Sequence, residues 1–337
     1  MRRFAGAAVV LGALGVVIAF LLWWLPADDF LLVPDSAKPL AGKVVVASDE
    51  SLQTAGDGDV YYVDLFVRRI RRLEQLLPFT RPDGATLVPE RVLAPDGTSD
   101  EERDRQNAAD MQRSELIASV VALRALGYDV VATPRGILVT GVAPDVPAAK
   151  SVKPGDVIVA VDDMSVRTPT QLRAQIGRRK PGDAVRLTIR RDEKPVEVTV
   201  RTIPSPQDAT KAIVGILVDQ DATIELPFDV DIDLGRVGGP SAGLPFALEI
   251  ARKLGRNVTH GCRIAATGEL ALDGSVLPIG GILQKTVGAR RADVDYFLVP
   301  VGENTEGARE NARGLRIIPV ESFQQALQKL TTGDIKC

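Results

Sequence analysis

The sequence predicts an α+β protein with an N-terminal transmembrane helix, a small β-rich domain and a larger mixed α/β domain. Three observations lead to this prediction. Residues 5–25 contain no charged side chain. Short β-branched runs separated by Pro-Gly-Asp turns follow residue 128. After residue 205, a strand pattern gives way to amphipathic helical patterns.

Composition excludes several classes of protein. The chain has 337 residues, 45% of them apolar, which is enough for a core without disulfide support. A net charge of −3 argues against a nucleic-acid partner, because such binding needs a basic face. The single histidine, His260, excludes H-E-x-x-H metalloproteases. Cys262 and Cys337 lack C-x-x-C spacing and predict neither a disulfide framework nor a zinc site. We therefore expect no metal and no cofactor.

Residues 1–26 have the pattern of a signal anchor. The uncharged residues 5–25 would span about 31 Å as a helix, roughly one hydrocarbon core. Arg2 and Arg3 precede them, so the positive-inside rule places the N-terminus in the cytoplasm and the rest outside the cell membrane. The alternative is a cleaved signal peptide, whose apolar core is shorter and ends at a small-x-small site. We expect a single-pass, retained anchor.

The next segments predict a stalk and a helix. Residues 27–42 contain Pro34 and Pro39 and are interpreted as an extended stalk. In residues 111–126, apolar side chains recur at three- and four-residue steps, and Gly127 follows. This spacing is typical of an amphipathic helix that ends at a glycine.

Residues 128–204 form a small β-rich module. Residues 136–140 and 157–161 are β-branched runs, and the turn Lys153-Pro-Gly-Asp156 leads into the second. Thr168, followed by proline and by glutamine three residues later, predicts a capped helix start. A second Pro-Gly-Asp turn introduces two further alternating runs, which predict a hairpin.

This order resembles a PDZ domain of the bacterial protease-associated kind, on the residues Pro-Arg-Gly-Ile-Leu-Val at 134–139 and the Pro-Gly-Asp-Val-Ile turn. The resemblance implies that a C-terminal peptide binds by strand addition and that loop N–H groups receive its carboxylate. It assigns this role to Arg135, Gly136, Ile137 and Leu138. The alternative is a β-module with a structural role only.

Ser241 lies in the glycine-rich turn 235–243, between an alternating strand and an apolar helix. Unpaired N–H groups and the helix dipole at such a helix start suit an anion. Two interpretations are open at this point. Ser241 is an ordinary N-cap, or it is a nucleophile beside an oxyanion site made by the N–H groups of Ser241 and Ala242.

A serine nucleophile also needs a base. His260 falls in a polar turn at the far end of the helix, so we expect it at the surface. Lys285 lies in the segment 276–288, which carries no other charge. Desolvation there would keep its amine neutral, as a general base requires. The alternative is a surface lysine whose stem packs on apolar neighbours.

Three motifs together resemble the proteolytic domain of the Lon family, which are serine–lysine peptidases: Gly-Pro-Ser241-Ala-Gly, Thr267-Gly-Glu, and Val-Leu-Pro-Ile-Gly-Gly-x-x-x-Lys285. The resemblance implies that Ser241 is the nucleophile and Lys285 the general base, and that the Thr267 hydroxyl orients the amine. The chain departs from the family in two ways. Gly238 stands where an acid is frequent, and no P-loop motif occurs, so we expect no ATP-driven unfolding.

The anchor and both modules together resemble the bacterial membrane-anchored, PDZ-containing Lon-like proteases. Met111-Gln-Arg-Ser114 matches a helix that precedes the catalytic half of Lon domains. We therefore expect residues 43–127 and 205–337 to form one domain, interrupted by the PDZ module.

The resemblance implies an ATP-independent serine endopeptidase that cleaves unfolded or exposed polypeptides outside the membrane, with the PDZ module recognising C-termini. It also implies the family's usual homo-hexamer. The alternative is an inactive PDZ-based envelope scaffold or adaptor.

Overall fold

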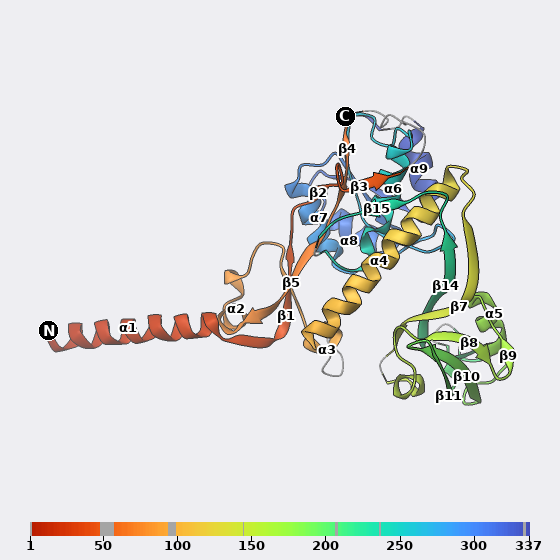
Figure 1. Cartoon of the computed structure of the whole chain (residues 1–337). Helices are drawn as coiled ribbons and strands as arrows, with labels where there is room; N and C mark the ends of the chain where they lie inside the picture. Colours follow the sequence, from red (N-terminus) through yellow and green to blue (C-terminus); the bar gives the residue numbers. More distant parts are fainter. Residues whose placement is uncertain are drawn as a thin grey trace. The chain divides into compact units, whose positions relative to one another are not determined.

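The computed structural model describes residues 2–47, 57–93, 99–143, 145–205, 208–235, 237–332 and 335–337. The chain divides into two compact units (Figure 1). Unit 1 comprises Met1–Tyr128 and Phe228–Cys337, and unit 2 comprises Asp129–Pro227. The rings of Tyr128 and Phe228, where the chain leaves and re-enters unit 1, meet edge-to-face with centroids 5.2 Å apart. Residues 205–227, which the sequence assigned to the Lon-like domain, belong to unit 2.

A five-stranded sheet forms the centre of unit 1 in the order β2-β4-β16-β19-β20. The strands are β2 (Lys38–Pro39), β4 (Asp59–Tyr62), β16 (Arg263–Ala266), β19 (Tyr296–Pro300) and β20 (Arg316–Val320). All neighbours are parallel except β2, which runs antiparallel to β4. Because β4 pairs with β16, the N-terminal and C-terminal segments of the chain share one sheet.

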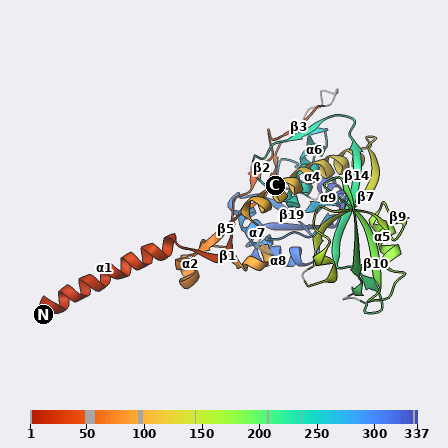
Figure 2. The same cartoon turned by 60° about the horizontal axis from the view of Figure 1, so that its bottom comes forward.

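Helices from both segments cover this sheet (Figure 2). They are α4 (Asp100–Ala125), α6 (Gly243–Lys253), α7 (Ile282–Arg291), α8 (Glu303–Asn311) and α9 (Phe323–Thr331). One buried cluster joins Phe297 and Val299 of β19 to Ala289 of α7 and Ala308 of α8. Since side chains alternate along a strand, the opposite face is left to α6, which packs against β4, β16, α9 and α4.

Residues 27–42 differ from the predicted stalk. Pro26–Pro34 forms β1, the central strand of a sheet with β5 (Leu65–Arg71) and β6 (Thr86–Val88). Leu31 of β1 and Ile70 of β5 are fully buried. The partner strands come from residues far along the chain, which is why the prolines alone gave the wrong interpretation.

The remaining elements of unit 1 are short. They are β3 (Val44–Val46) paired with β15 (Val230–Ile232), β17 (Glu269–Leu270) paired with β18 (Val276–Leu277), α2 (Arg72–Leu76), α3 (Glu90–Leu93), and two 3₁₀ turns at Pro78–Thr80 and Pro240–Ala242.

Helix α1 (Arg2–Trp24) covers most of the predicted anchor. Within the part of the chain that the structure describes, no helix is both long enough and apolar enough to cross a membrane. The predicted transmembrane helix over residues 5–25 is therefore not supported by the structure.

Unit 2 is built on a sheet in the order β11-β10-β8-β7-β14, with β9 paired to β8. Its elements are β7 (Val131–Val142), a 3₁₀ turn (Pro147–Lys150), β8 (Val157–Val161), β9 (Met164–Ser165), α5 (Pro169–Ile176), β10 (Ala184–Arg191), β11 (Lys194–Arg201), β12 (Ile203–Pro204), β13 (Ala212–Ile213) and β14 (Ile216–Glu225). Thr168 caps α5 by accepting a hydrogen bond from the Gln171 N–H at 3.3 Å, as the sequence predicts.

The first Pro-Gly-Asp turn of unit 2 is fixed by its acid. Asp156 is buried and accepts a hydrogen bond from the Lys153 N–H at 2.8 Å. The guanidinium of Arg191 binds both oxygens of the same carboxylate at 2.7 Å. Gly155 has φ +91°, a conformation that favours glycine. These contacts explain why this motif leads directly into β8.

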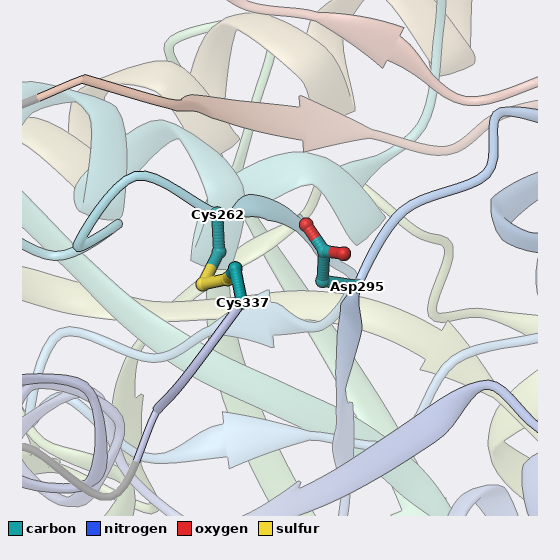
Figure 3. Close-up of side chains that lie close together, drawn as sticks. All are labelled: Cys262, Asp295 and Cys337. Atoms are coloured by element: carbon teal, nitrogen blue, oxygen red, sulfur yellow. A yellow bond between two sulfur atoms is a disulfide. The ribbon is translucent and has the colours of Figure 1, made fainter.

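Cys262 and Cys337 form a disulfide (Figure 3), which the sequence did not predict. Their Cα atoms are 5.6 Å apart, within the usual range for a disulfide. The bond joins the start of β16 to the C-terminal residue. Since 75 residues separate the two cysteines, no local spacing reveals the pair.

Candidate active site

The turn before α6 holds Ser241, and helix α4 supports it. Ser241 lies in the 3₁₀ turn Pro240–Ala242, which leads directly into α6. The hydroxyl of Ser114, on α4, donates to the Pro240 carbonyl at 3.0 Å. The N–H of Gly239 donates to the carbonyl of Asn107, also on α4, at 2.9 Å. The Met-x-x-Ser motif thus supplies a contact that fixes the position of the serine turn.

A glycine and an asparagine fix the start of α7, the helix that carries Lys285. Gly281, the N-cap of α7, has φ +70°, and a Cβ there would clash with Leu65. Asn304, on α8, binds the turn that precedes α7 through both the oxygen and the nitrogen of its side-chain amide. It accepts a hydrogen bond from the Ile279 N–H at 2.8 Å and donates to the Ile279 carbonyl at 2.9 Å. The start of α7, and therefore Lys285, is fixed by these contacts.

The structure brings Ser241, Thr267 and Lys285 together. The Lys285 amine (Nζ) lies 2.5 Å from the Ser241 hydroxyl oxygen and 3.3 Å from that of Thr267. The Thr267 hydroxyl donates to the Ser241 carbonyl at 3.2 Å. Thr267 itself is tied to the central sheet by its N–H, which donates to the Leu298 carbonyl at 3.0 Å. Three residues from three separate motifs therefore form one hydrogen-bonded group.

Burial controls the protonation of the lysine. Lys285 is 4% exposed and Thr267 1%, whereas Ser241 is half-buried. Loss of solvation lowers the pKa of Lys285 to about 8, against an opposing contribution from the charge of Asp64. A lysine with this pKa has a usable neutral fraction near neutral pH, as a general base must.

Backbone groups orient the peptide bond of Ser241. The Gly268 N–H donates to the Ser241 carbonyl at 2.9 Å, and the Leu244 N–H donates to the Gly268 carbonyl at 3.0 Å. The N–H groups of Ser241 and Ala242 lie at the start of α6, where the helix dipole is positive. Their role as oxyanion donors stays a prediction.

The packing of α4 explains why a glycine fits at position 238. A Cβ at this position would lie 2.8 Å from the Cβ of Asn107, closer than the two atoms can approach. An acid at position 238 would therefore require α4 to move. The sequence shows that no acid stands at position 238, and the structure adds that α4 fills the space which such a side chain would need.

Two functional residues escaped the sequence analysis. Asn304 looked like an ordinary helical residue, and its role follows only from the contacts with the turn at Ile279. Asp64 affects the protonation of Lys285 from a segment over 200 residues away in sequence. Its signal was available: Asp64 is the only charged residue between 60 and 67.

His260 and the cysteines lie away from this chemistry. His260 is exposed in the turn after α6, and its N–H donates to the Asn257 side chain at 2.9 Å. Among the described residues, Cys262, Asp295 and Cys337 are the one group of three or more whose potential metal-ligating atoms all lie within 4.8 Å of one another (Figure 3). Because both sulfurs belong to the disulfide, they are not available as thiolate ligands.

The peptide-binding residues predicted in unit 2 lie in β7, which has a partner strand on each side. Gly136, Ile137 and Leu138 are in β7, between β8 and β14. Arg135 is half-exposed, with its guanidinium 3.8 Å from Asp221. Since β7 is paired on both sides, it cannot receive an added strand at these residues. In the described part of unit 2 the sheet ends at β11 on one side and at β14 on the other, and α5 packs against β14.

Comparisons with known proteins agree with these two units. Residues 229–333 match the family model of the Lon protease C-terminal proteolytic domain, and residues 124–202 match that of the PDZ domain. Lon protease 2 of Bacillus subtilis is 32% identical over 112 residues, which cover 33% of this chain and 19% of the relative. The Lon protease of Desulforamulus reducens is 36% identical over 116 residues, which cover 34% of this chain and 13% of the relative.

A solved structure also matches. The PDZ domain of the SdrC-like protein from Listeria innocua is 27% identical, with a TM-score of 0.24, and the match covers 25% of this chain and 93% of that domain. The chain spans less than a fifth of the length of the curated Lon relatives named above. By the two family models, the chain carries a PDZ domain and a Lon-type proteolytic domain, and the second domain is similar to that of the serine-type Lon peptidases.

Proposed function

We propose that this chain is a serine endopeptidase that uses Ser241 as nucleophile and Lys285 as general base. The observation that carries the proposal is the 2.5 Å hydrogen bond between the Ser241 hydroxyl and the amine of a buried lysine. A nucleophile within hydrogen-bond reach of a base whose pKa lies near the working pH is the arrangement that covalent catalysis requires.

Acylation begins with proton transfer from the Ser241 hydroxyl to the neutral Lys285 amine. The serine oxygen forms a bond to the carbonyl carbon of the substrate, and the carbonyl oxygen becomes negatively charged. When this intermediate collapses, the carbon–nitrogen bond breaks and the Lys285 ammonium gives its proton to the leaving amine. The products are an ester on Ser241, a released C-terminal fragment and a neutral lysine.

Deacylation repeats the sequence with water. Lys285 takes a proton from a water molecule while the water oxygen bonds to the ester carbon. Collapse breaks the bond to the serine oxygen, which regains its proton from Lys285. The N–H groups of Ser241 and Ala242 are the proposed donors to the oxyanion in both halves. Thr267 holds the amine toward the serine, because its hydroxyl accepts from Lys285 and donates to the Ser241 carbonyl.

Unit 2 is proposed to recognise the C-terminus of a polypeptide at β14. Strand addition needs an unpaired edge beside a surface for side chains. β14 is one of the two end strands of the described sheet, the other being β11, and α5 packs beside β14. This site replaces the one predicted at Arg135, Gly136, Ile137 and Leu138.

Three further proposals rest on the sequence. The first is that these 337 residues cleave without ATP, since no P-loop motif occurs among them. The protein acts outside the cytoplasmic membrane and is attached to it through residues 1–26, as the uncharged stretch after Arg2 and Arg3 indicates. It forms a homo-hexamer, as the resemblance to Lon implies. Membrane fractionation with protease accessibility tests the second proposal, and light scattering tests the third.

The catalytic proposal is tested with variants of the full chain on an unstructured polypeptide. Ser241→Ala and Lys285→Met are each expected to abolish cleavage, and His260→Ala to leave it unchanged. Unchanged cleavage in the first two variants would exclude the dyad. Capture of C-terminal peptides with no cleavage by the parent chain would favour the scaffold function instead.

A further inference from the structure

A half-buried carboxylate whose charge acts on Lys285 has no role in the proposed mechanism. Asp64 lies between β4 and β5, and its side chain is 19% exposed. The amine of Lys38 lies 3.4 Å from one oxygen of Asp64 and 2.6 Å from the carboxylate of Asp35. The other oxygen of Asp64 is buried and finds no hydrogen-bond partner among the described residues. A buried carboxylate oxygen without a hydrogen-bond partner lowers the stability of the folded chain, so its presence calls for an explanation.

The neighbours of Asp64 pack against α7 on both sides of Lys285. A Cβ at Gly281 would clash with Leu65, and one at Gly288 would lie 3.0 Å from Val63 and clash with the Asp35 carbonyl. Gly281 and Gly288 lie four residues before and three residues after Lys285, so all three share one side of α7. The segment that contains Asp64 therefore crosses α7 at the level of Lys285.

The charges around Asp64 act in opposite directions. Burial is the largest effect and raises the pKa of Asp64, while the Lys38 ammonium lowers it. The negative charge of Asp35 and a hydrogen bond with the Asp35 carboxyl group raise it further. The Tyr62 phenol also faces the group, and its own pKa is raised chiefly by burial. On α7, Arg291 turns away and donates to the Pro34 carbonyl at 3.0 Å. Asp64 is the group whose negative charge raises the pKa of Lys285 against the effect of burial.

We propose that Asp64 is a positioning residue of the Ser241–Lys285 dyad, supplying from the β4–β5 connection the carboxylate that position 238 cannot hold. When Ser241 gives its proton to Lys285, a cation forms in a buried site. The charge of Asp64 stabilises that cation and so favours the proton transfer. This inference rests on the proposed function, because it assigns Asp64 a part in the same proton transfer.

The test measures the titration of Lys285 directly, so it does not depend on activity. In the Ser241→Ala chain, the rate at which acetic anhydride labels Lys285 is followed against pH by mass spectrometry. Adding Asp64→Asn is expected to lower the labelling midpoint of Lys285 by about half a pH unit or more, a threefold change in its neutral fraction. Adding Asp35→Asn removes a charge from the same carboxylate pair. Asp35→Asn is expected to leave the labelling midpoint of Lys285 unchanged or to raise it. Without the negative charge of Asp35, Asp64 ionises more readily and its own charge stabilises the Lys285 ammonium.

Activity supplies the second measurement. In the chain that retains Ser241, kcat is measured at about pH 9.5, where Lys285 is mostly neutral in every variant. There Asp64→Asn is expected to lower kcat about threefold with little change in KM, and Asp64→Glu to restore part of the loss. An unchanged midpoint in Asp64→Asn, or an equal fall in Asp35→Asn, would overturn the proposal. Thermal unfolding of each variant shows whether it is folded. If Asp64→Asn does not fold, Asp64→Ser replaces it, and the same fall in the labelling midpoint of Lys285 is expected. If the midpoint shifts but Ser241→Ala leaves cleavage intact, the proposed function fails while the electrostatic contact stands.

Discussion

Cleavage by this chain should depend on pH through one amine. Burial lowers the pKa of Lys285 from 10.5 to about 8, and only the neutral amine can accept the serine proton. At pH 7 about one molecule in ten then carries a neutral Lys285, and at pH 6 about one in a hundred. The value of kcat/KM should therefore rise about tenfold per pH unit below the midpoint and level off above it.

The measurement is kcat/KM on an unstructured polypeptide between about pH 6 and about pH 9.5. The His260→Ala chain is the control, because His260 is exposed and should leave the profile unchanged. A rate that is constant across this range would refute the assignment of Lys285 as base. A midpoint near 6.5, where an ordinary histidine titrates, would refute it as well.

The remaining predictions concern stability and the groups around the dyad. The folded state holds Lys285 at a lower pKa than the unfolded state, so the unfolded state binds more protons and stability should rise between about pH 8 and about pH 10.5. Lys285→Met should remove this penalty and stabilise the chain by about 3 kcal/mol at pH 7 in urea unfolding. Thr267→Val should lower kcat about tenfold with KM unchanged in steady-state assays, because it removes a hydroxyl that bonds the lysine. Gly238→Asp should destabilise the chain by about 1–3 kcal/mol in thermal unfolding, and Asn107→Gly should relieve part of that loss, since the two side chains compete for one space.

Local signals predicted the local elements. The capped helix at Thr168 and the strand that follows the Lys153-Pro-Gly-Asp156 turn form as expected, because contacts within a few residues fix them. The proximity of Ser241 and Lys285 came from motif resemblance and not from local physics. Their contact in space depends on the packing of α6 and α7, whose partners come from both ends of the chain.

Long-range pairing explains the failures. Leu31 is buried because β5 and β6 flank it, and no pattern within residues 27–42 contains that information. The same holds for β14, which pairs along most of the length of β7 and therefore belongs to unit 2. Charge proximity between Asp64 and Lys285 likewise exists only in the folded chain.

The edge-to-face contact of Tyr128 and Phe228 has a consequence for modular exchange. The chain departs from unit 1 and returns to it at two points whose rings are 5.2 Å apart. An insert whose own ends lie close together can be grafted there without stretching unit 1. Unit 2 can therefore be swapped for another domain, or replaced by a short glycine–serine bridge, while the Ser241–Lys285 pair keeps its geometry.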